Sequence, residues 1–425
     1  MLDRPQTGER ALLLQLSVGR AATADETQEF RALAVSAGAD IVDEMAVRVA
    51  RPNPRYFAGV GKADEIAARA KTAGAELILV SHALAPNQER NIERLAEVRV
   101  LDRNGLILDI FAQRAASHEG KLQVELAQLE HLSTRLVRGW SHLERQKGGI
   151  GLRGPGETQL ETDRRLIGQR IKRLKQKLDR VRQQRETGRR ERQRANVPTV
   201  ALVGYTNAGK TTLFNRLSGA TLEAKNQLFA TLDPTIRRLR LNPGEEVLLV
   251  DTVGFVRDLP HELVAAFHST LTETRDATLL LHVIDASDPH HEDRLQQVEE
   301  VLDEIGARDV PTLRVYNKSD QVAGFGELDG ADCTKISVSA RTGAGMERLL
   351  HGIRRQVVGA PVTGQLRLDP HQSRIRAKLF DWDAVKSEQV DAAGRWTLEV
   401  ELSARRWREL REMEGITRDA ISHKA

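Results

Sequence analysis

The sequence predicts an α/β protein that is divided into several domains. Apolar strands alternate with helical patterns over the first 110 residues, and the same alternation returns between Val197 and Val358. Such alternation is typical of largely parallel sheets covered by helices. The second block also contains a glycine-rich loop with the spacing of a phosphate-binding loop. At 425 residues the chain is long enough for about three domains with well-buried cores.

Residues 1–111 are expected to form a small α/β domain with a largely parallel sheet. Four apolar runs are predicted to be its strands: Ala11–Val18, Ile41–Val49, Leu77–Val80 and Val98–Leu101. Helical patterns lie between them, over Thr23–Ala37, Lys62–Ala73 and Pro86–Ala96. The third helix begins on a proline, which is favourable in the first turn of a helix.

Residues 112–195 are expected to form a helical hairpin, because two sets of apolar residues recur every three or four positions. The first set is Leu122, Leu126, Leu129, Leu132 and Leu136, and the second is Ile167, Ile171, Leu174, Leu178 and Val181. Between them, Lys147–Gly156 contains five glycines and one proline. This composition excludes a helix and predicts a loop at the tip of the hairpin. The loop either connects the helices or contacts a ligand, and its local chemistry favours neither.

Positive charge is concentrated in this hairpin. It contains 21 Lys and Arg against 10 Asp and Glu, a net charge of +11, which leaves −7 for the rest of a chain whose total is +4. A basic module between acidic ones indicates a polyanionic partner, although a solvated charged helix would have the same pattern.

Composition also limits the class of protein. Cys333 is the single cysteine, which excludes an internal disulfide and a cysteine-rich zinc site and fits a reducing cytoplasm. No run approaches the roughly 18 apolar residues of a membrane span, so we expect a cytoplasmic protein that does not associate with membranes. Residues 365–425 are expected to form a small α+β domain. Its predicted elements are strands at Ile375–Phe380 and Trp396–Leu402, a turn at Asp391–Gly394 and a helix over Ala404–Met413.

Residues 196–359 contain the strongest functional signal. The apolar strand Thr199–Val203 leads into a loop of the form GxxxxGK[ST] and then into a helix. The loop and helix start are Gly204, Tyr205, Thr206, Asn207, Ala208, Gly209, Lys210, Thr211 and Thr212. This is the context that a phosphate loop requires, because backbone amides and a helix N-terminus bind anions. Lys210 is expected to reach the β- and γ-phosphates of a nucleotide, and the Thr211 hydroxyl is expected to bind Mg²⁺.

A DxxG motif follows the next apolar strand, Glu246–Val250. Its residues are Asp251, Thr252, Val253 and Gly254. Asp251 is expected to hold the outer coordination shell of Mg²⁺, and the amide of Gly254 is expected to bond the γ-phosphate.

Two later motifs indicate guanine rather than adenine. The first is NKxD, formed by Asn317, Lys318, Ser319 and Asp320, and the second consists of Ser339, Ala340 and Arg341. A carboxylate at Asp320 accepts hydrogen bonds from N1–H and the 2-amino group of guanine. Adenine has neither donor and would leave the carboxylate unpaired, which discriminates strongly between the bases.

The segment between the phosphate loop and the DxxG motif must supply a hydroxyl that meets Mg²⁺ only when a γ-phosphate is present. Thr231 and Thr235 are both candidates, and the pattern favours neither.

Taken together, these motifs resemble the Obg–HflX family of P-loop GTPases. The matching segments are GYTNAGKTTLFN, FATLDPT, DTVGF, NKSD and SAR, together with the earlier PRYFAGVGK and GGIGLRGPGETQLETDRR. The resemblance covers about 360 residues and is much weaker in the C-terminal domain. It implies GTP hydrolysis with Mg²⁺, with Lys210 and Thr231 as catalytic residues and Thr231 as a Mg²⁺ ligand. It also implies that the nucleotide is lined by Phe229, Ala230, Thr231, Leu232 and Asp233.

The same resemblance implies a partner. Proteins of this family bind the large (50S) ribosomal subunit and its rRNA, with roles in ribosome splitting or rescue under stress or in ribosome biogenesis. The glycine-rich loop is then expected to contact RNA, and Arg153 at its tip is our candidate contact residue. We expect a monomer.

Phe255 occupies the position where Ras-like enzymes place the glutamine that orients the attacking water. An apolar ring cannot polarise water, so we expect slow intrinsic hydrolysis that the ribosome stimulates. Alternatively, Phe255 only packs, and His261 or His268 replaces the glutamine.

Two other functions remain open from the sequence. One is a GTP-gated RNA-binding scaffold with little turnover. The other is an ATP-using RNA remodeller, in which Gly59–Lys62 would contribute to a second nucleotide site in the N-terminal domain.

Overall fold

The chain forms two units in the computed structural model. One contains residues 1–189 with two short segments, 225–233 and 256–270, and the other contains 190–224, 234–255 and 271–425. The structure describes residues 8–138, 155–194, 197–220, 228–242, 245–257, 273–322, 334–359, 362–402, 406–407, 410 and 421–423. Among these residues, no helix has both the length and the apolar content needed to cross a bilayer.

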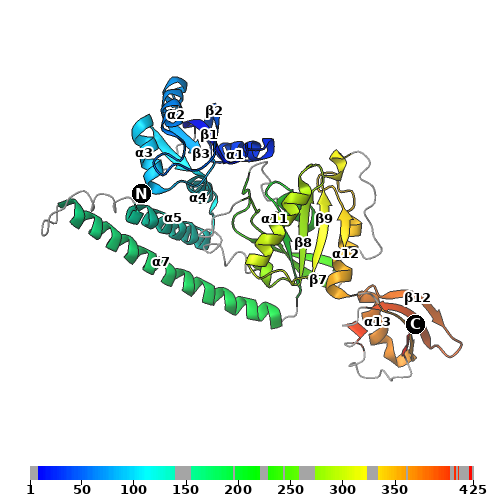
Figure 1. Ribbon diagram of the computed structural model, residues 1–425. Helices are drawn as coiled ribbons and strands as arrows, with labels where there is room; N and C mark the ends of the chain where they lie inside the picture. Colours follow the sequence, from blue (N-terminus) through cyan, green and yellow to red (C-terminus); the bar gives the residue numbers. More distant parts are fainter. Residues whose placement is uncertain are drawn as a thin grey trace. The chain divides into compact units, whose positions relative to one another are not determined.

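The first unit begins with a four-stranded parallel sheet in the order β2-β1-β3-β4 (Figure 1), which confirms the predicted α/β architecture. Its strands are β1 (Arg10–Val18), β2 (Asp40–Val49), β3 (Leu77–Val80) and β4 (Arg99–Asp102). Its helices are α1 (Ala24–Ser36), α2 (Val60–Ala73), α3 (Pro86–Ala96) and α4 (Arg103–Arg114).

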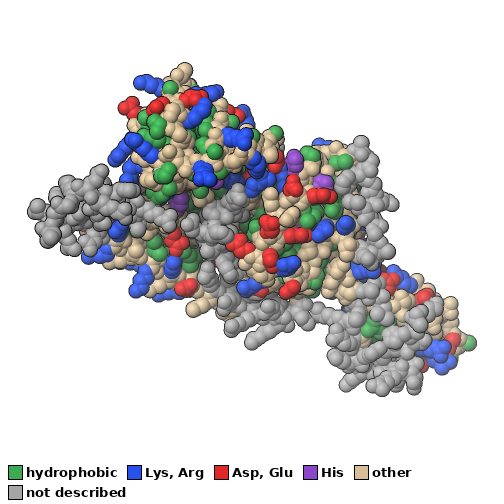
Figure 2. All heavy atoms as spheres, in the orientation of Figure 1, with side chains coloured by type: hydrophobic (Ala, Val, Ile, Leu, Met, Phe, Trp, Pro, Cys, Tyr) green, Lys and Arg blue, Asp and Glu red, His purple; other side chains and the backbone are tan. Residues whose placement is uncertain are grey.

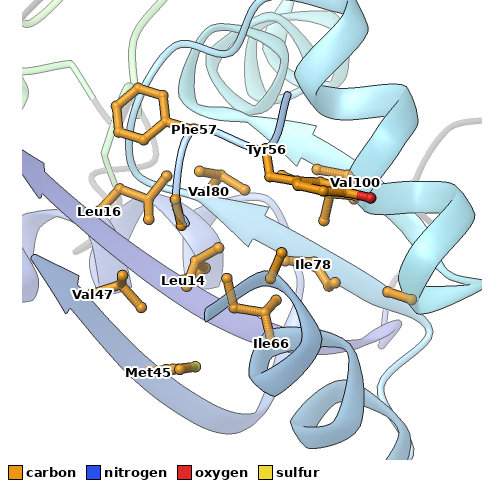
Figure 3. Close-up of a cluster of buried hydrophobic side chains, with 14 of the residues drawn as sticks. Leu14, Leu16, Met45, Val47, Tyr56, Phe57, Ile66, Ile78, Val80 and Val100 are labelled. Atoms are coloured by element: carbon orange, nitrogen blue, oxygen red, sulfur yellow. The ribbon is translucent and has the colours of Figure 1, made fainter. Parts of the chain in front are cut away.

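The position of each strand in this sheet follows from its apolar pattern. The central strand β1 is a nearly continuous apolar run that is buried on both faces. At the edge, β2 alternates, with Met45, Val47 and Val49 buried and the residues between them exposed. Figure 3 shows side chains of β1, β2 and β3 meeting Ile66 of α2 and Tyr56 in one apolar core.

Two long helices, α5 (His118–Arg138) and α7 (Pro155–Arg194), form the predicted hairpin. They lie side by side in Figure 1, and their apolar stripes meet through Leu122 and Leu126 of α5 and Leu174 and Leu178 of α7. Ion pairs flank this seam, from Arg170 to Glu125 and from Lys175 to Glu130. Most of the glycine-rich loop, including Arg153, lies outside the described residues.

The second unit contains a six-stranded sheet in the order β10-β9-β8-β5-β7-β6. The strands are β5 (Thr199–Val203), β6 (Thr235–Asn242), β7 (Glu245–Asp251), β8 (Leu279–Asp285), β9 (Thr312–Asn317) and β10 (Lys335–Ser337). All neighbours are parallel except β6 and β7. Helices α8 (Lys210–Ser218), α11 (His291–Glu304) and α12 (Met346–Val358) and the short 3₁₀ helix η1 (Ser319–Gln321) accompany it.

The C-terminal part has its own antiparallel sheet, in the order β12-β13-β11-β14. Its elements are β11 (Val362–Leu368), the 3₁₀ helix η2 (Pro370–Gln372), α13 (Ser373–Asp381), β12 (Val385–Val390), β13 (Trp396–Leu402) and β14 (Ile421–His423). This confirms the expected α+β class.

One predicted strand in this domain is wrong. Ile375–Phe380 lies in the helix α13, where the buried residues are Ile375 and Leu379. These two positions are four apart, which is the spacing of one helix face rather than of a strand. The predicted turn is confirmed, since the amide of Gly394 donates to the carbonyl of Asp391 at 3.0 Å.

Candidate functional site

The predicted phosphate loop connects β5 to α8 at the carboxyl end of the parallel sheet. Two of its glycines have backbone angles that favour glycine, with φ of +147° at Gly204 and +89° at Gly209. A Cβ atom at Gly204 would lie 2.3 Å from the carbonyl oxygen of Val283, and one at Gly209 would lie 2.3 Å from Nδ2 of Asn317. The loop therefore excludes side chains at these two positions, as a close backbone cradle for phosphate requires.

Lys210 is folded against this loop. Its ammonium group donates hydrogen bonds to the carbonyls of Gly204 at 3.0 Å and Tyr205 at 2.8 Å. Burial lowers the pKa of Lys210 to about 8, and the charge of Asp251 opposes that shift. The buried hydroxyl of Thr206, two residues after Gly204, has no hydrogen-bond partner among the described residues. A buried cation and a buried donor on one loop fit an anionic ligand.

Thr211 and Asp251 bring two hard oxygen groups together at the end of β7. The Thr211 hydroxyl donates to Oδ2 of Asp251 at 2.9 Å, and Asp251 is fully buried. The neighbouring Thr252 hydroxyl donates to the carbonyl of Leu202 at 2.5 Å, which fixes this strand end against β5. A hydroxyl beside a carboxylate is the donor chemistry that Mg²⁺ prefers, so these residues fit that ion.

Backbone hydrogen bonds connect the end of the DxxG segment to the phosphate loop. The amide of Thr206 donates to the carbonyl of Phe255 at 2.7 Å, and the amide of Phe255 donates to the carbonyl of Gly204 at 3.1 Å. The Phe255 side chain is buried. A Cβ atom at Gly254 would lie 2.8 Å from Cγ2 and 3.0 Å from the backbone Cα of Thr206, so a side chain there would displace the phosphate loop. Phe255 thus packs in the interior, which is compatible with both of the sequence-based alternatives for the group that orients water.

Asn317 joins two of the predicted motifs. From the end of β9 its Nδ2 donates to the carbonyl of Ala208 at 2.8 Å, and its Oδ1 accepts from the amide of Ala340 at 3.0 Å. Lys318 follows in the left-handed region, and its ammonium group donates to Asp285 at 2.6 Å. Asp285 was not among the site residues predicted from the sequence. Its place at the end of the buried strand β8, which neighbours β9, was the available signal.

Asp320 lies in η1 beside the Ser339–Arg341 loop. The hydroxyl of Ser339 donates to its Oδ1 at 2.7 Å, and the guanidinium of Arg341 lies 2.7 Å from its Oδ2. The hydrogen bond from Ser339 lowers the pKa of Asp320, and the charge of Arg341 adds to this. Asp320 is therefore held as an anion that can accept N–H donors.

The structure thus brings four predicted motifs together within the second unit. These are residues 204–212, 251–254, 317–320 and 339–341.

Residues 228–233 lie in the segment between the phosphate loop and the DxxG motif, and they belong to the first unit, where they contact α4 and the start of α5. The Phe229 ring is buried against Phe111 of α4, with ring centroids 4.6 Å apart. The Asp233 carboxylate accepts from the amides of Ala116 and Ser117 at 2.9 and 2.7 Å, just before α5 begins. Of the others in this segment, Leu232 is buried, and Ala230 and Thr231 are half-buried. The nucleotide contacts that the family resemblance implies for this segment stay predictions.

Arg257, just after the DxxG motif, also belongs to the first unit. Its guanidinium pairs with Glu26 of α1 at 2.8 Å, and its carbonyl accepts from Arg103 of α4 at 2.8 Å. The hydrogen bond from Arg20 lowers the pKa of Glu26 to about 2, and the charge of Arg257 contributes. Sequence reasoning missed this contact. His261 and His268 lie outside the described residues.

A phosphate loop, a DxxG segment and an NKxD motif at the carboxyl edge of a parallel sheet define a P-loop guanine-nucleotide-binding protein. Family models match most of the chain. They are the GTP-binding GTPase N-terminal region over residues 24–112, the GTP-binding GTPase middle region over 114–192, and a 50S ribosome-binding GTPase over 199–318.

The chain is 51% identical over 418 residues to the GTPase HflX of Escherichia coli (strain K12), covering 97% of this chain and 98% of that protein. It is 45% identical over 409 residues to the GTPase HflX of Magnetococcus marinus, covering 95% and 94%. A GTP-binding protein from the archaeon Sulfolobus solfataricus, solved with GDP, is 25% identical with a TM-score of 0.45, covering 82% and 98%. The chain belongs to the HflX family of GTPases.

Proposed function

We propose that this GTPase associates with the large (50S) ribosomal subunit and acts in ribosome splitting or rescue under stress, or in ribosome biogenesis. The observation that carries the proposal is the cationic surface of α7. The description of the matching family model as a 50S ribosome-binding GTPase supports the same partner.

Only two of the α7 side chains that the structure describes, Leu174 and Leu178, are buried. Basic side chains cover much of the rest, as the blue atoms along this helix show in Figure 2. Six exposed ones form no ion pair within the described part of the chain: Arg164, Arg165, Lys172, Arg173, Lys177 and Arg180. Cations without acidic partners are available to neutralise phosphates, and rRNA presents many of them.

In the proposed mechanism the chain's own residues bind and orient the nucleotide. Lys210 places positive charge beside the phosphates, and Asp320 selects guanine. Thr211 and Asp251 would hold Mg²⁺, which supplies charge neutralisation at the β- and γ-phosphate oxygens. Since the buried Phe255 cannot orient water, the group that does so comes from another segment or from the ribosome.

Single-turnover GTP hydrolysis, with and without purified 50S subunits, tests this proposal. We expect the subunits to raise the rate at least tenfold, since a group supplied in trans stabilises the transition state in other GTPases by about 10³-fold or more. Equal rates with and without subunits would contradict ribosomal stimulation. A Lys210→Ala control separates turnover by this chain from GTPases that contaminate the ribosomes.

The buried Phe255 also favours a second candidate, a GTP-gated scaffold with little turnover. The two candidates differ in how the chain leaves its partner. If release of 50S subunits is as fast with a non-hydrolysable GTP analogue as with GTP, the scaffold is the better description.

A further inference from the structure

The carboxylate of Asp320 has two partners of very different character. The Ser339 hydroxyl, which donates to Oδ1, belongs to a fully buried residue. The Arg341 guanidinium, at Oδ2, belongs to a side chain that is 75% exposed, whereas the Asp320 side chain is only 14% exposed. Oδ1 of Asp320 therefore bonds a buried hydroxyl of the loop, whereas Oδ2 pairs with a guanidinium that is exposed to solvent.

Arg341 presents the chemistry that a guanine base would present. The N1–C2–N2 edge of guanine is itself a guanidine, with two N–H donors side by side. The arginine side chain carries the same planar arrangement of N–H donors, which matches a carboxylate. Asp320 in this structure therefore accepts from an internal group that resembles the edge of its expected ligand.

The backbone on both sides of Arg341 is fixed independently of this ion pair. The amide of Ala340 donates to Asn317 at 3.0 Å, and the amide of Thr342 donates to the Ser339 hydroxyl at 3.1 Å. Arg216 of α8 donates to the carbonyl of Thr342 at 3.0 Å. The Arg341 side chain can therefore leave Asp320 without disturbing the loop that Ser339 and Ala340 build.

We propose that Arg341 competes with the guanine base for Asp320 and so slows nucleotide association and limits nucleotide affinity. The inference rests on the assignment of Asp320 as the guanine-recognising residue. When Arg341 closes over Asp320, only the fraction of molecules with the carboxylate open binds guanine. Because the Arg341 side chain is exposed, the ion pair is weak and a substantial fraction of molecules has the carboxylate open. The cost to nucleotide affinity is then about two- to fivefold.

Stopped-flow binding of a fluorescent GDP to the full chain tests the competition. Arg341→Ala is expected to associate about two- to fivefold faster and to bind correspondingly tighter, with Arg341→Lys between it and the wild type. Arg308→Ala is the matched control, because Arg308 is an equally exposed arginine of the same unit that pairs with Asp303. Salt screens exposed ion pairs. Raising the salt concentration should therefore reduce the difference in association rate between the wild type and Arg341→Ala.

Two results would overturn the competition. One is unchanged association with faster dissociation in Arg341→Ala, which would make Arg341 a nucleotide contact. The other is identical kinetics in the two proteins. An Asp320→Ala variant distinguishes failure of the proposed competition from failure of the assignment of Asp320 as the guanine-recognising residue. If that variant still prefers GDP over ADP as the wild type does, the guanine assignment is wrong. If the preference is lost, adding Arg341→Ala to it should have no further effect.

Discussion

At the residue scale, we expect nucleotide binding to depend on Lys210. It is buried against its own loop, and burial lowers its pKa to about 8. The charged form attracts the phosphates, so GDP affinity should be constant below pH 8 and fall above it, by up to about tenfold per pH unit. A titration with fluorescent GDP between pH 7 and pH 9 measures this. Lys210→Arg, which stays charged, should bind with little pH dependence; an equally steep fall there would point to another group.

The pKa of His282 leads to a second prediction, which concerns stability at acidic pH. It lies in β8, where burial, followed by the charges of Arg314 and Lys210, lowers its pKa to about 3. The folded value is below the ordinary value of about 6.5, so the unfolded chain takes up a proton that the folded domain does not. The free energy of unfolding therefore decreases as pH falls from about 6.5 towards 3. At pH 5 the contribution of His282 to this loss is about 2 kcal/mol.

Calorimetry at pH 7 and pH 5 checks the prediction for His282. The relevant unfolding transition is the one that GDP shifts upward, since a ligand stabilises the domain that binds it. His282→Leu should lose less stability between the two pH values than the wild type, and the exposed His371→Leu should behave like the wild type. If His282→Leu keeps the full acid sensitivity, His282 is not its source.

At the scale of the elements, the start of α5 depends on a residue far away in the sequence. Asp233 accepts from two amides there, and its Oδ1 also accepts from the Ser117 hydroxyl at 2.5 Å. A Cβ atom at Gly120 would lie 2.3 Å from the same carboxylate oxygen. A carboxylate at a helix N-terminus satisfies amides that the helix itself leaves without partners.

We expect Asp233→Ala to destabilise this helix end by about 1 kcal/mol, the usual cost of losing such a cap. Hydrogen exchange of residues 116–124 should become about fivefold faster, while exchange in the N-terminal sheet should not change. Asp64→Ala, an exposed aspartate of α2, serves as the control. Unchanged exchange in Asp233→Ala would show that α5 does not need this carboxylate.

The elements that could be predicted correctly from the sequence are those marked by a local pattern of apolar residues. The phosphate loop and NKxD could be predicted because each follows an apolar strand directly. The carboxyl ends of β5 and β9 lie at the same edge of the sheet, where Asn317 meets Ala208. The strand predicted at Ile375–Phe380 failed because a short apolar run has weak periodicity, and tertiary packing made it a helix. Contacts such as Asp233 with Ser117 join residues 116 positions apart, and nothing local in the sequence encodes them.

At the scale of the whole molecule, we propose that the second unit binds the nucleotide and the helical hairpin contacts the ribosome. The cationic surface of α7 and the glycine-rich loop before it are the proposed RNA-binding surface. Electrostatic contacts with RNA weaken steeply with salt, so subunit binding should fall as ionic strength rises.

Co-sedimentation with purified 50S subunits, in GDP and in a non-hydrolysable GTP analogue, is the most direct test of nucleotide-dependent ribosome binding. We expect association to be stronger with the analogue, and to become at least tenfold weaker when residues 148–156 are deleted or in an Arg153→Glu variant. A Lys378→Glu variant in α13 controls for the general loss of positive charge. Equal sedimentation in both nucleotides, or undiminished binding by the loop deletion, would contradict the account.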